Sequence, residues 1–392
     1  MNLLNYIANQ ITPEGLDEVQ RVMIAHKLKQ NVSLCGPAGV GKTELIETLA
    51  KQIVNQKLFD ISCNDRMTES PLIGYPTLET NGSTKTGYTN GVVTNAMEQG
   101  GIGYLDEFDL LVPGEQKRLN PIFDKRRKIT RRDGKEITAD DLFRGVISYN
   151  PGRSVHGDLE DSVADRFVNM FFGYLPEDVE TKVALAKEGI KININTEIRG
   201  IKGGRENPQF LKAEVVESRS SGEKSYSWFD FFSGEAVHDT TDIVAYEAFI
   251  SEPVDTSGLD LVVGTEADIV ALTKQLAKYN TIVRSLGADG TTNLEESART
   301  ALDSLGECKK VRLHSPSPRT LHYAIAQANL LSNMGMPLEL AKRHATRVEM
   351  DQICYGNFKN KEIQSGITTY TAVEMIAQTQ GLLDRDGVTT TF

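Results

Sequence analysis

The chain has 392 residues, of which 39% are hydrophobic, so it is long enough to bury more than one core and to form about two or three domains. It carries 43 Lys and Arg residues against 54 Asp and Glu residues, and its formal net charge is −11. This average charge repels polyanions, which excludes a protein that nucleic acid or anionic lipid coats over its whole surface. The average does not exclude local basic patches.

Cysteine usage and the lack of long apolar segments indicate the compartment in which the chain works. Cys35, Cys63, Cys308 and Cys354 are far apart and form no CxxC pair, which argues against a zinc knuckle or a disulfide framework. The first residues lack the features of a secretory signal, and no window approaches about 18 consecutive apolar residues. We therefore expect a soluble, non-secreted protein in a reducing cytoplasm.

Residues 32–43 form a short apolar run followed by Gly-x-x-x-x-Gly-Lys-Thr, and a helical pattern comes next. Glycines let the backbone curl until its N–H groups point inward, and the helix offers its positive N-terminal end to phosphates. The alternative, a glycine-rich turn that binds nothing, does not account for the complete strand–loop–helix motif. We predict a phosphate-binding loop for ATP that consists of Gly36, Pro37, Ala38, Gly39, Val40, Gly41, Lys42, Thr43 and Glu44.

The motif also assigns roles to two of these side chains and to a later strand. Lys42 is expected to reach the β and γ phosphates, and the Thr43 hydroxyl to bind Mg²⁺. The apolar run 101–105 ends in Asp106 and Glu107, which we expect to hold Mg²⁺ through water and to act as general base, respectively. By itself this run could be a strand that enters an acidic helix cap, but its place downstream of a phosphate loop favours a catalytic pair.

A third predicted strand, residues 145–150, ends in Asn150 and is followed by Pro and Gly. If this strand is parallel to the first two, Asn150 lies at the same carboxyl edge of the sheet, where open α/β sheets bind their ligands. Asn150 could then orient the hydrolytic water. The alternative is an Asx-type turn at Asn-Pro-Gly.

Together with Asp165, Arg166 and Phe167, these elements resemble the AAA+ ATPases. Residues 148–152 and 166–168 are similar to the MoxR branch of that family, especially its CbbQ and NorQ members. The resemblance covers roughly residues 15 to 190 well and the C-terminal helices loosely. It implies a first sensor at Asn150 and an arginine finger at Arg166, which completes the site of a neighbouring subunit in a ring, usually a hexamer. A surface arginine is the alternative for Arg166.

The resemblance further implies a second sensor in the C-terminal lid, on a helix that starts near residue 318. Arg319 is the candidate, and Arg312 and Arg343 are weaker rivals. The MoxR branch also implies an adaptor with a von Willebrand factor A domain and a protein client.

Residues 192–262 depart from the compact family pattern and predict a β-rich insertion. The insertion contains the only tryptophan of the chain within the aromatic segment 226–232. These aromatic residues either form the insertion's own small core or anchor a partner.

A second departure is a concentration of positive charge around a predicted hairpin turn at Asp133 and Gly134. In the family, a hairpin at this place faces the centre of the ring, where repeated cations would attract an acidic peptide or a nucleic acid strand. A solvated basic surface is the alternative. The cations are Lys125, Arg126, Arg127, Lys128, Arg131, Arg132 and Lys135.

These observations lead to an α/β fold: a three-layer AAA+ core with a parallel sheet at residues 1–175, the start of a lid at 176–191, the β-rich insertion at 192–262 and a helical lid at 263–392. The predicted function is ATP-driven remodelling or maturation of a protein client. A nucleic-acid motor that uses the basic hairpin is the alternative. A nucleotide-gated scaffold with negligible turnover is a third hypothesis, against which the intact Glu107 argues.

Overall fold

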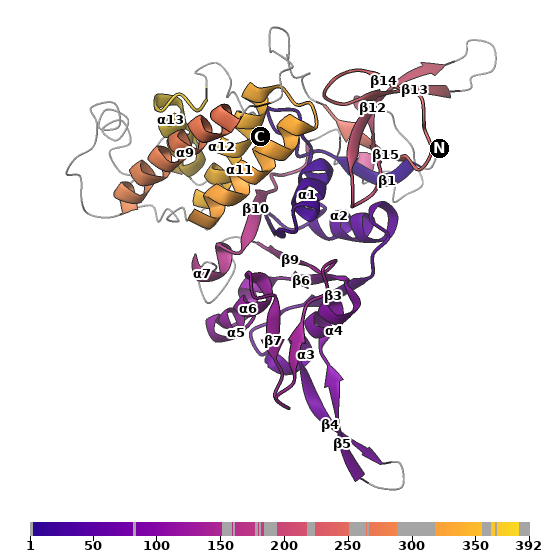
Figure 1. Ribbon diagram of the computed structural model, residues 1–392, viewed down its shortest axis with the longest axis vertical. Coiled ribbons are helices and arrows are strands. Elements are labelled where there is room, and N and C mark those ends of the chain that lie inside the picture. Colours follow the sequence, from indigo (N-terminus) through magenta and orange to yellow (C-terminus); the bar gives the residue numbers. More distant parts are fainter. Residues whose placement is uncertain are drawn as a thin grey trace.

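The computed structural model describes residues 3–80, 84–150, 159, 161–176, 179, 182–183, 194–217, 224–250, 264, 266–287, 318–354, 362–364 and 367–383. Figure 1 shows three regions: a central α/β region, a second sheet beside it, and a group of C-terminal helices. Among the helices of the described residues, none combines the length and the apolar character needed to cross a membrane.

Five parallel strands form the central sheet in the order β10-β2-β9-β6-β3. β2 and β9 lie in its middle, and every residue of both is buried, as expected for a parallel sheet that is covered on both faces. The strands are β2 (Asn31–Cys35), β3 (Leu58–Ser62), β6 (Ile102–Asp106), β9 (Arg144–Tyr149) and β10 (Phe167–Phe171). This sheet confirms the predicted parallel α/β fold.

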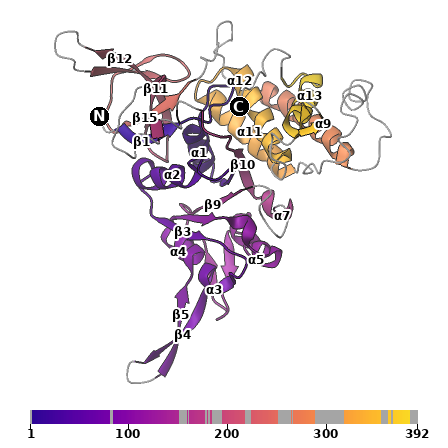
Figure 2. The same ribbon diagram turned by 180° about the vertical axis from the view of Figure 1, so that it is seen from behind.

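Helices cover both faces of the central sheet. In Figures 1 and 2, α1 and α2 lie on one side of it and α3 to α6 on the other, which makes three layers. The helices are α1 (Glu18–Lys27), α2 (Lys42–Thr48) with a π-helical continuation (Leu49–Ile53), α3 (Glu69–Leu72), α4 (Val92–Gln99), a 3-10 turn (Phe108–Leu110), α5 (Pro113–Arg118), α6 (Asn120–Phe123) and α7 (Asp161–Ala164).

Two antiparallel hairpins extend from the layer formed by α3 to α6. β4 (Gly74–Thr80) and β5 (Thr84–Asn90) form a long hairpin that projects from the body of the molecule (Figure 1). β7 (Lys128–Thr130) and β8 (Glu136–Thr138) pair around a turn in which Gly134 has a φ of 84°. The hairpin predicted at Asp133 and Gly134 is therefore confirmed.

The second sheet has six strands in the order β1-β15-β11-β12-β13-β14. They are β1 (Leu3–Ala8), β11 (Thr196–Lys202), β12 (Gln209–Glu217), β13 (Lys224–Asp230), β14 (Ala236–Val237) and β15 (Val244–Phe249). Five of them lie within the predicted insertion. β1 comes from the N-terminus, and the expectation that residues 1–175 all belong to the core is wrong for this strand. β1 pairs in parallel with β15, and a single short strand carries no local signal for so distant a partner.

The aromatic segment of the insertion forms part of that sheet's own core. Trp228 is 5% exposed and clusters with Leu211 and Ala245. A Cβ at Gly200 would lie 2.7 Å from the Trp228 ring, so only glycine leaves room for the ring at this position. Of the two interpretations, the small core is thus confirmed for Trp228.

The C-terminal helices lie beside β10, an outermost strand of the central sheet, on which α12 packs. Two buried ion pairs join them to the core, Arg21 to Asp351 at 2.8 Å and Arg347 to Glu14 at 3.1 Å. The elements are α9 (Glu266–Gly287), α11 (Pro318–Asn333), α12 (Leu338–Ile353), β16 (Glu362–Gln364), β17 (Ile367–Thr368) and α13 (Thr369–Thr379). The domain limits given above stay a prediction.

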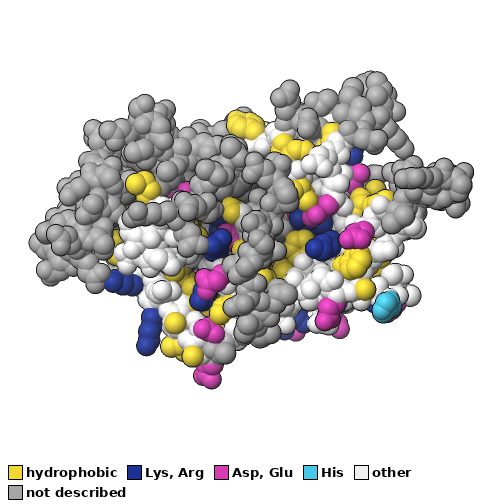
Figure 3. All heavy atoms as spheres, turned by 90° about the horizontal axis from the view of Figure 1, so that it is seen from above, with side chains coloured by type: hydrophobic (Ala, Val, Ile, Leu, Met, Phe, Trp, Pro, Cys, Tyr) yellow, Lys and Arg dark blue, Asp and Glu magenta, His cyan; other side chains and the backbone are white. Residues whose placement is uncertain are grey.

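Acidic and basic side chains are mixed on the face seen from above in Figure 3. Where this face shows described residues, Lys and Arg lie beside Asp and Glu rather than in one extended patch of a single sign.

Candidate active site

The loop between β2 and α2 has the backbone geometry that its glycines predict. Gly39 and Gly41 have φ values of 82° and 91°, in the left-handed region that favours glycine. A Cβ on Gly36 would lie 2.5 Å from the Phe172 carbonyl oxygen, so close approach of two backbones requires glycine there as well. The loop leads directly into α2, whose N-terminal end carries the partial positive charge of the helix dipole and therefore suits an anion.

Lys42 is the first residue of α2, and its ammonium group contacts both this loop and the end of a second strand. Its ammonium group donates hydrogen bonds to the carbonyls of Gly36 at 2.7 Å and Pro37 at 2.8 Å. It also donates to the Asn150 amide oxygen at 2.8 Å. Asn150 follows β9, so the structure brings together the predicted phosphate-binding lysine and the predicted water-orienting amide.

Thr43 and Asp106, the two expected metal ligands, are linked through two side chains that have no predicted role. Thr43 Oγ1 lies 3.1 Å from the Tyr104 hydroxyl, which lies 2.9 Å from Ser148 Oγ. The Ser148 hydroxyl in turn donates to Asp106 Oδ1. The available sequence signal was the presence of a tyrosine and a serine within two largely apolar strands, because buried hydroxyls need partners.

Burial raises the pKa of Tyr104 to about 12, so its hydroxyl keeps its proton at neutral pH. The side chains of Tyr104 and Ser148 lie on adjacent strands β6 and β9, and α2 brings Thr43 to them. The oxygen atoms of Thr43 and Asp106 are hard ligands of the kind that Mg²⁺ prefers, and this donor set fits that ion.

Glu107 lies directly beyond β6 in a backbone conformation that is uncommon for a residue with a side chain, with a φ of 52°. Its N–H donates to Asp106 Oδ1 at 3.0 Å, and its carboxylate accepts from the Ser62 hydroxyl at 3.1 Å. Burial, together with the charge of Glu107, raises the pKa of nearby Asp109 to about 6. Three carboxyl groups therefore lie close together at this edge of the sheet.

Arg166 lies at the opposite edge of the same sheet. It precedes β10, whose Phe167 pairs with Asn31 at the start of β2, while the phosphate loop follows Cys35 at the other end. Five residues of parallel strand span roughly 16 Å, so Arg166 is not brought to the phosphate loop of its own chain. Its guanidinium group lies 3.9 Å from Asp124 Oδ2. Its assignment as an arginine finger stays a prediction.

The candidates for the second sensor are placed only in part. Arg319 lies in the first turn of α11, but its side chain is outside the described residues, as is the whole of Arg312. Arg343 lies on α12. Since α11 packs on α12 and contacts α1, this helix borders the core, and the role of Arg319 stays a prediction.

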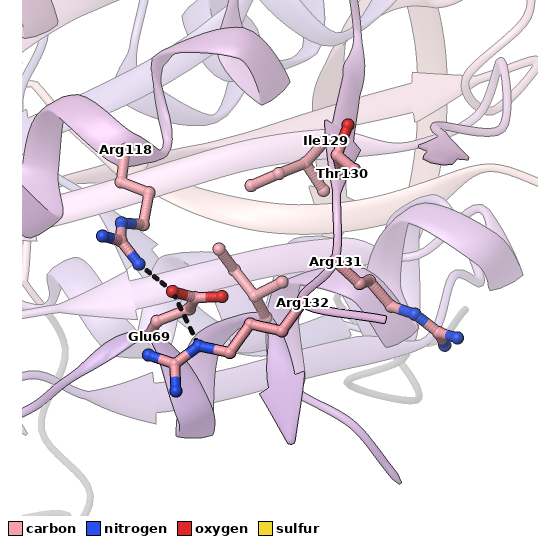
Figure 4. A pocket seen from close by; sticks show the side chains of 7 residues that line it. Glu69, Arg118, Ile129, Thr130, Arg131 and Arg132 are labelled. Carbon is pink, nitrogen blue, oxygen red and sulfur yellow. Dashed lines mark ion pairs between the residues drawn. The ribbon is translucent and has the colours of Figure 1, made fainter. Parts of the chain in front are cut away.

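Most cations of the basic hairpin have partners within the chain. Figure 4 shows Arg118 and Arg132 reaching the carboxylate of Glu69 from two sides of a pocket of about 260 Å³, while Arg131 points away. Arg131 pairs with Asp133 and lies over the Tyr88 ring. The remaining contacts are Arg126 with Asp124, Lys128 with Glu136, Lys135 with Glu98, and Arg127 with the carbonyls of Asp140 and Phe143.

Comparison with known proteins gives the family. Residues 31–167 match the AAA domain of the dynein-related subfamily. The protein CbbQ of Hydrogenophilus thermoluteolus is 32% identical over 176 residues, which are 44% of this chain and 64% of CbbQ. An uncharacterized protein of Staphylococcus saprophyticus is 31% identical over 182 residues, 46% of this chain and 67% of that protein. An uncharacterized protein of Staphylococcus aureus strain USA300 is 32% identical over 155 residues, which are 39% of this chain and 59% of that protein.

The fold has a counterpart among solved structures. A crystal structure of a candidate ATPase from Cytophaga hutchinsonii superposes with a TM-score of 0.51 at 15% identity, over 92% of this chain and 87% of that chain. At this identity the likeness concerns the fold alone. The fold, the phosphate loop and the family match define a P-loop ATPase of the AAA+ class. The chain belongs to the MoxR type of this class and is related to CbbQ, although the matches span only 59% to 67% of the curated relatives.

Proposed function

We propose that the protein couples Mg²⁺-dependent ATP hydrolysis to the remodelling or maturation of a protein client, as a ring of identical subunits, usually six, assisted by an adaptor with a von Willebrand factor A domain. The observation that carries the catalytic part is the presence of two hydrogen-bonded sets at one edge of the sheet: Lys42 with Asn150, and Thr43 with Asp106 through Tyr104 and Ser148. The adaptor and the client rest on relatedness to the MoxR type alone.

Each residue of the site has a chemical task in this proposal. Lys42 and the loop N–H groups bind the phosphates, and Glu107 accepts a proton from a water that Asn150 orients. Mg²⁺ held by Thr43 and, through water, by Asp106 would neutralise charge on the β and γ phosphates. Arg166 of one subunit would enter its neighbour's site, and Arg319 would reach the γ-phosphate from the lid. A cytoplasmic location is supported by the free thiols Cys35, Cys63 and Cys354.

Two observations favour a protein client over a nucleic acid. Cations of the β7–β8 hairpin form ion pairs with carboxylates of the same chain, so fewer of them are left to neutralise phosphates. On the projecting β4–β5 hairpin, Tyr75 is 46% and Leu78 is 75% exposed. Apolar side chains at such a place suit contact with a polypeptide.

Replacement of Glu107 tests the catalytic assignment. Glu107→Gln keeps the shape of the side chain but removes the base, so we expect ATP binding to persist while turnover falls by roughly 10²- to 10⁴-fold. Steady-state phosphate release and binding of a fluorescent ATP analogue measure the two properties. Lys42→Ala, which removes the phosphate contact, is expected to lose binding. Wild-type turnover in Glu107→Gln would refute the assignment. Negligible turnover in the unmodified chain, with binding retained, would support the scaffold hypothesis.

The Glu107→Gln variant also separates the two client classes. In ATP it should retain its client, so affinity purification followed by mass spectrometry is expected to recover a protein together with a von Willebrand factor A domain protein. Stimulation of ATP turnover by DNA or RNA that disappears with added salt would instead support the nucleic-acid motor. Lack of stimulation across single-stranded and double-stranded substrates leaves protein remodelling as the favoured function.

A further inference from the structure

Four hydroxyl and carboxyl groups form a continuous chain of hydrogen bonds beneath the proposed metal site. The chain runs from Thr43 at the start of α2, through Tyr104 on β6 and Ser148 on β9, to Asp106 at the end of β6. Tyr104 is 1% exposed and Ser148 is fully buried. The chain therefore connects the two expected metal ligands through the interior of the sheet, away from water.

The number of hydrogens determines in which direction the donors of this chain point. Each hydroxyl has one hydrogen, and an ionised carboxylate only accepts. The Ser148 hydroxyl donates to Asp106 Oδ1, so its hydrogen is used. Tyr104 then donates its single hydrogen either to Ser148 Oγ or to the Asp106 carboxylate, and in both cases Thr43 must donate to the Tyr104 oxygen. All donors thus point from Thr43 towards Asp106.

This direction has a consequence for the two metal ligands. A hydroxyl that binds a cation does so through its lone pairs, and its hydrogen must point elsewhere. Because the Thr43 hydrogen is directed at Tyr104, the lone pairs of Thr43 are left for the ion. On Asp106, both the Ser148 hydroxyl and the Glu107 N–H bond the same oxygen, Oδ1, so the other oxygen is left for the metal's water.

We propose that Tyr104 and Ser148 are positioning residues of the Mg²⁺ site, which orient the Thr43 hydroxyl and the Asp106 carboxylate before the ion arrives. This inference rests on the proposed function, because it concerns the metal of the same site. Packing alone does not explain the pair, since Phe and Ala would fill the same buried positions without polar atoms that need partners. Neither residue touches the nucleotide in this proposal, and both act through the ligands.

The test compares nucleotide affinity with and without the metal. Binding of a fluorescent ATP analogue is measured in Mg²⁺ and in EDTA, in the Glu107→Gln background so that turnover does not interfere. We expect Tyr104→Phe to lower the Mg²⁺-dependent gain in affinity roughly three- to tenfold, the value of one hydrogen bond, and to leave affinity in EDTA unchanged. Ser148→Ala should act in the same direction and serves if Tyr104→Phe does not fold.

A matched control and a double variant complete the experiment. Tyr279→Phe removes another buried tyrosine hydroxyl, in the lid, and should keep the wild-type gain. The Tyr104→Phe/Ser148→Ala protein should lose little more than the worse single variant, because both interrupt one chain. The inference alone would be overturned if both single variants kept the Mg²⁺-dependent gain in affinity of the wild type. It would also be overturned if they lost as much affinity in EDTA as in Mg²⁺. Failure of the Glu107→Gln parent to bind ATP in either condition would overturn the proposed function as well.

Discussion

Two buried histidines show how single residues make stability depend on pH. Burial, with the nearby charge of Arg144, lowers the pKa of His26 to about 4. Burial likewise lowers the pKa of His344 to about 3, and Arg21 adds to this effect. Both rings are therefore neutral in the folded protein at pH 5, whereas the unfolded chain protonates them below about pH 6.5. Their contribution to stability is complete above pH 6.5 and falls as the pH is lowered towards 4.

Replacement of His344 tests this pH dependence. His344 bonds Gln327 Oε1 at 2.8 Å, a contact that the amide of His344→Gln can reproduce without titrating. Between pH 7.5 and pH 5, we expect the wild type to lose about 2 kcal/mol more free energy of unfolding than the variant. Urea unfolding at the two pH values measures the difference. Glu18, whose pKa burial raises to about 7, acts in the opposite direction but is common to both proteins.

His322→Gln is the control for this experiment, because His322 lies on neighbouring α11 and is exposed. The control should keep the pH dependence of the wild type. If the free energy of unfolding of His344→Gln fell between pH 7.5 and pH 5 by as much as that of the wild type, His344 would not be a neutral, buried residue.

At the scale of elements, one carboxylate joins the second sheet to the core. Asp17 caps α1 by accepting from the Gln20 N–H at 2.8 Å. Its other oxygen accepts from Arg199 of β11 and from the Tyr246 hydroxyl of β15, both at 2.9 Å. Asp17 is fully buried, and only 4% of the Arg199 side chain is exposed. The insertion is therefore held on the same helix start that supports the ATPase core.

Removal of Arg199 should consequently destabilise the whole protein rather than the insertion alone. Arg199→Met leaves the Asp17 charge buried without its main partner, and we expect a loss of about 3–5 kcal/mol in the free energy of unfolding. Chemical denaturation followed by circular dichroism reports on the whole chain, and fluorescence of the single tryptophan, Trp228, reports on the insertion; we expect both curves to shift together. Lys212→Met changes the exposed residue opposite Arg199 on β12 and should cost less than about 0.5 kcal/mol. Similar values for the two variants would show that the buried pair contributes little.

At the scale of the whole molecule, the position of Arg166 bears on assembly. The arginine lies at the edge of the sheet opposite the phosphate loop, so any action on a nucleotide requires a second subunit. The same geometry leaves room for a purely structural role through Asp124. Subunit mixing distinguishes the two roles because it supplies the arginine and the phosphate loop from different chains.

We expect Arg166→Ala and Lys42→Ala proteins to have little ATP turnover alone and to regain part of it when mixed. In a mixed ring, the intact loop of an Arg166→Ala subunit can receive Arg166 from a Lys42→Ala neighbour. Phosphate release measured against the mixing ratio shows the recovery, and size-exclusion chromatography shows whether both variants still assemble. Absence of recovery in assembled mixtures would assign Arg166 a structural role.

Features that depend on adjacent residues could be predicted from the sequence, whereas contacts between distant residues could not. The glycines of residues 36–41 and the Asp133–Gly134 turn were predictable, because the required backbone geometry depends on a few adjacent residues. The proximity of Lys42 and Asn150 could also be predicted, because the carboxyl ends of parallel strands lie at the same edge of a sheet. A role for Tyr104 and Ser148 could not be predicted, because their hydroxyls come into contact only when β6 and β9 pair in the folded sheet.

The sequence by itself determined the phosphate loop, the acidic pair at the end of β6 and the parallel α/β class. Each of these features depends on adjacent residues or on the periodicity of single strands. Only the tertiary structure decided that β1 joins the insertion's sheet, that Asp17 holds Arg199, and that hairpin cations meet carboxylates from other elements. These contacts join residues that are distant in sequence. Their partners are chosen by packing and charge in the folded chain, which no local pattern encodes.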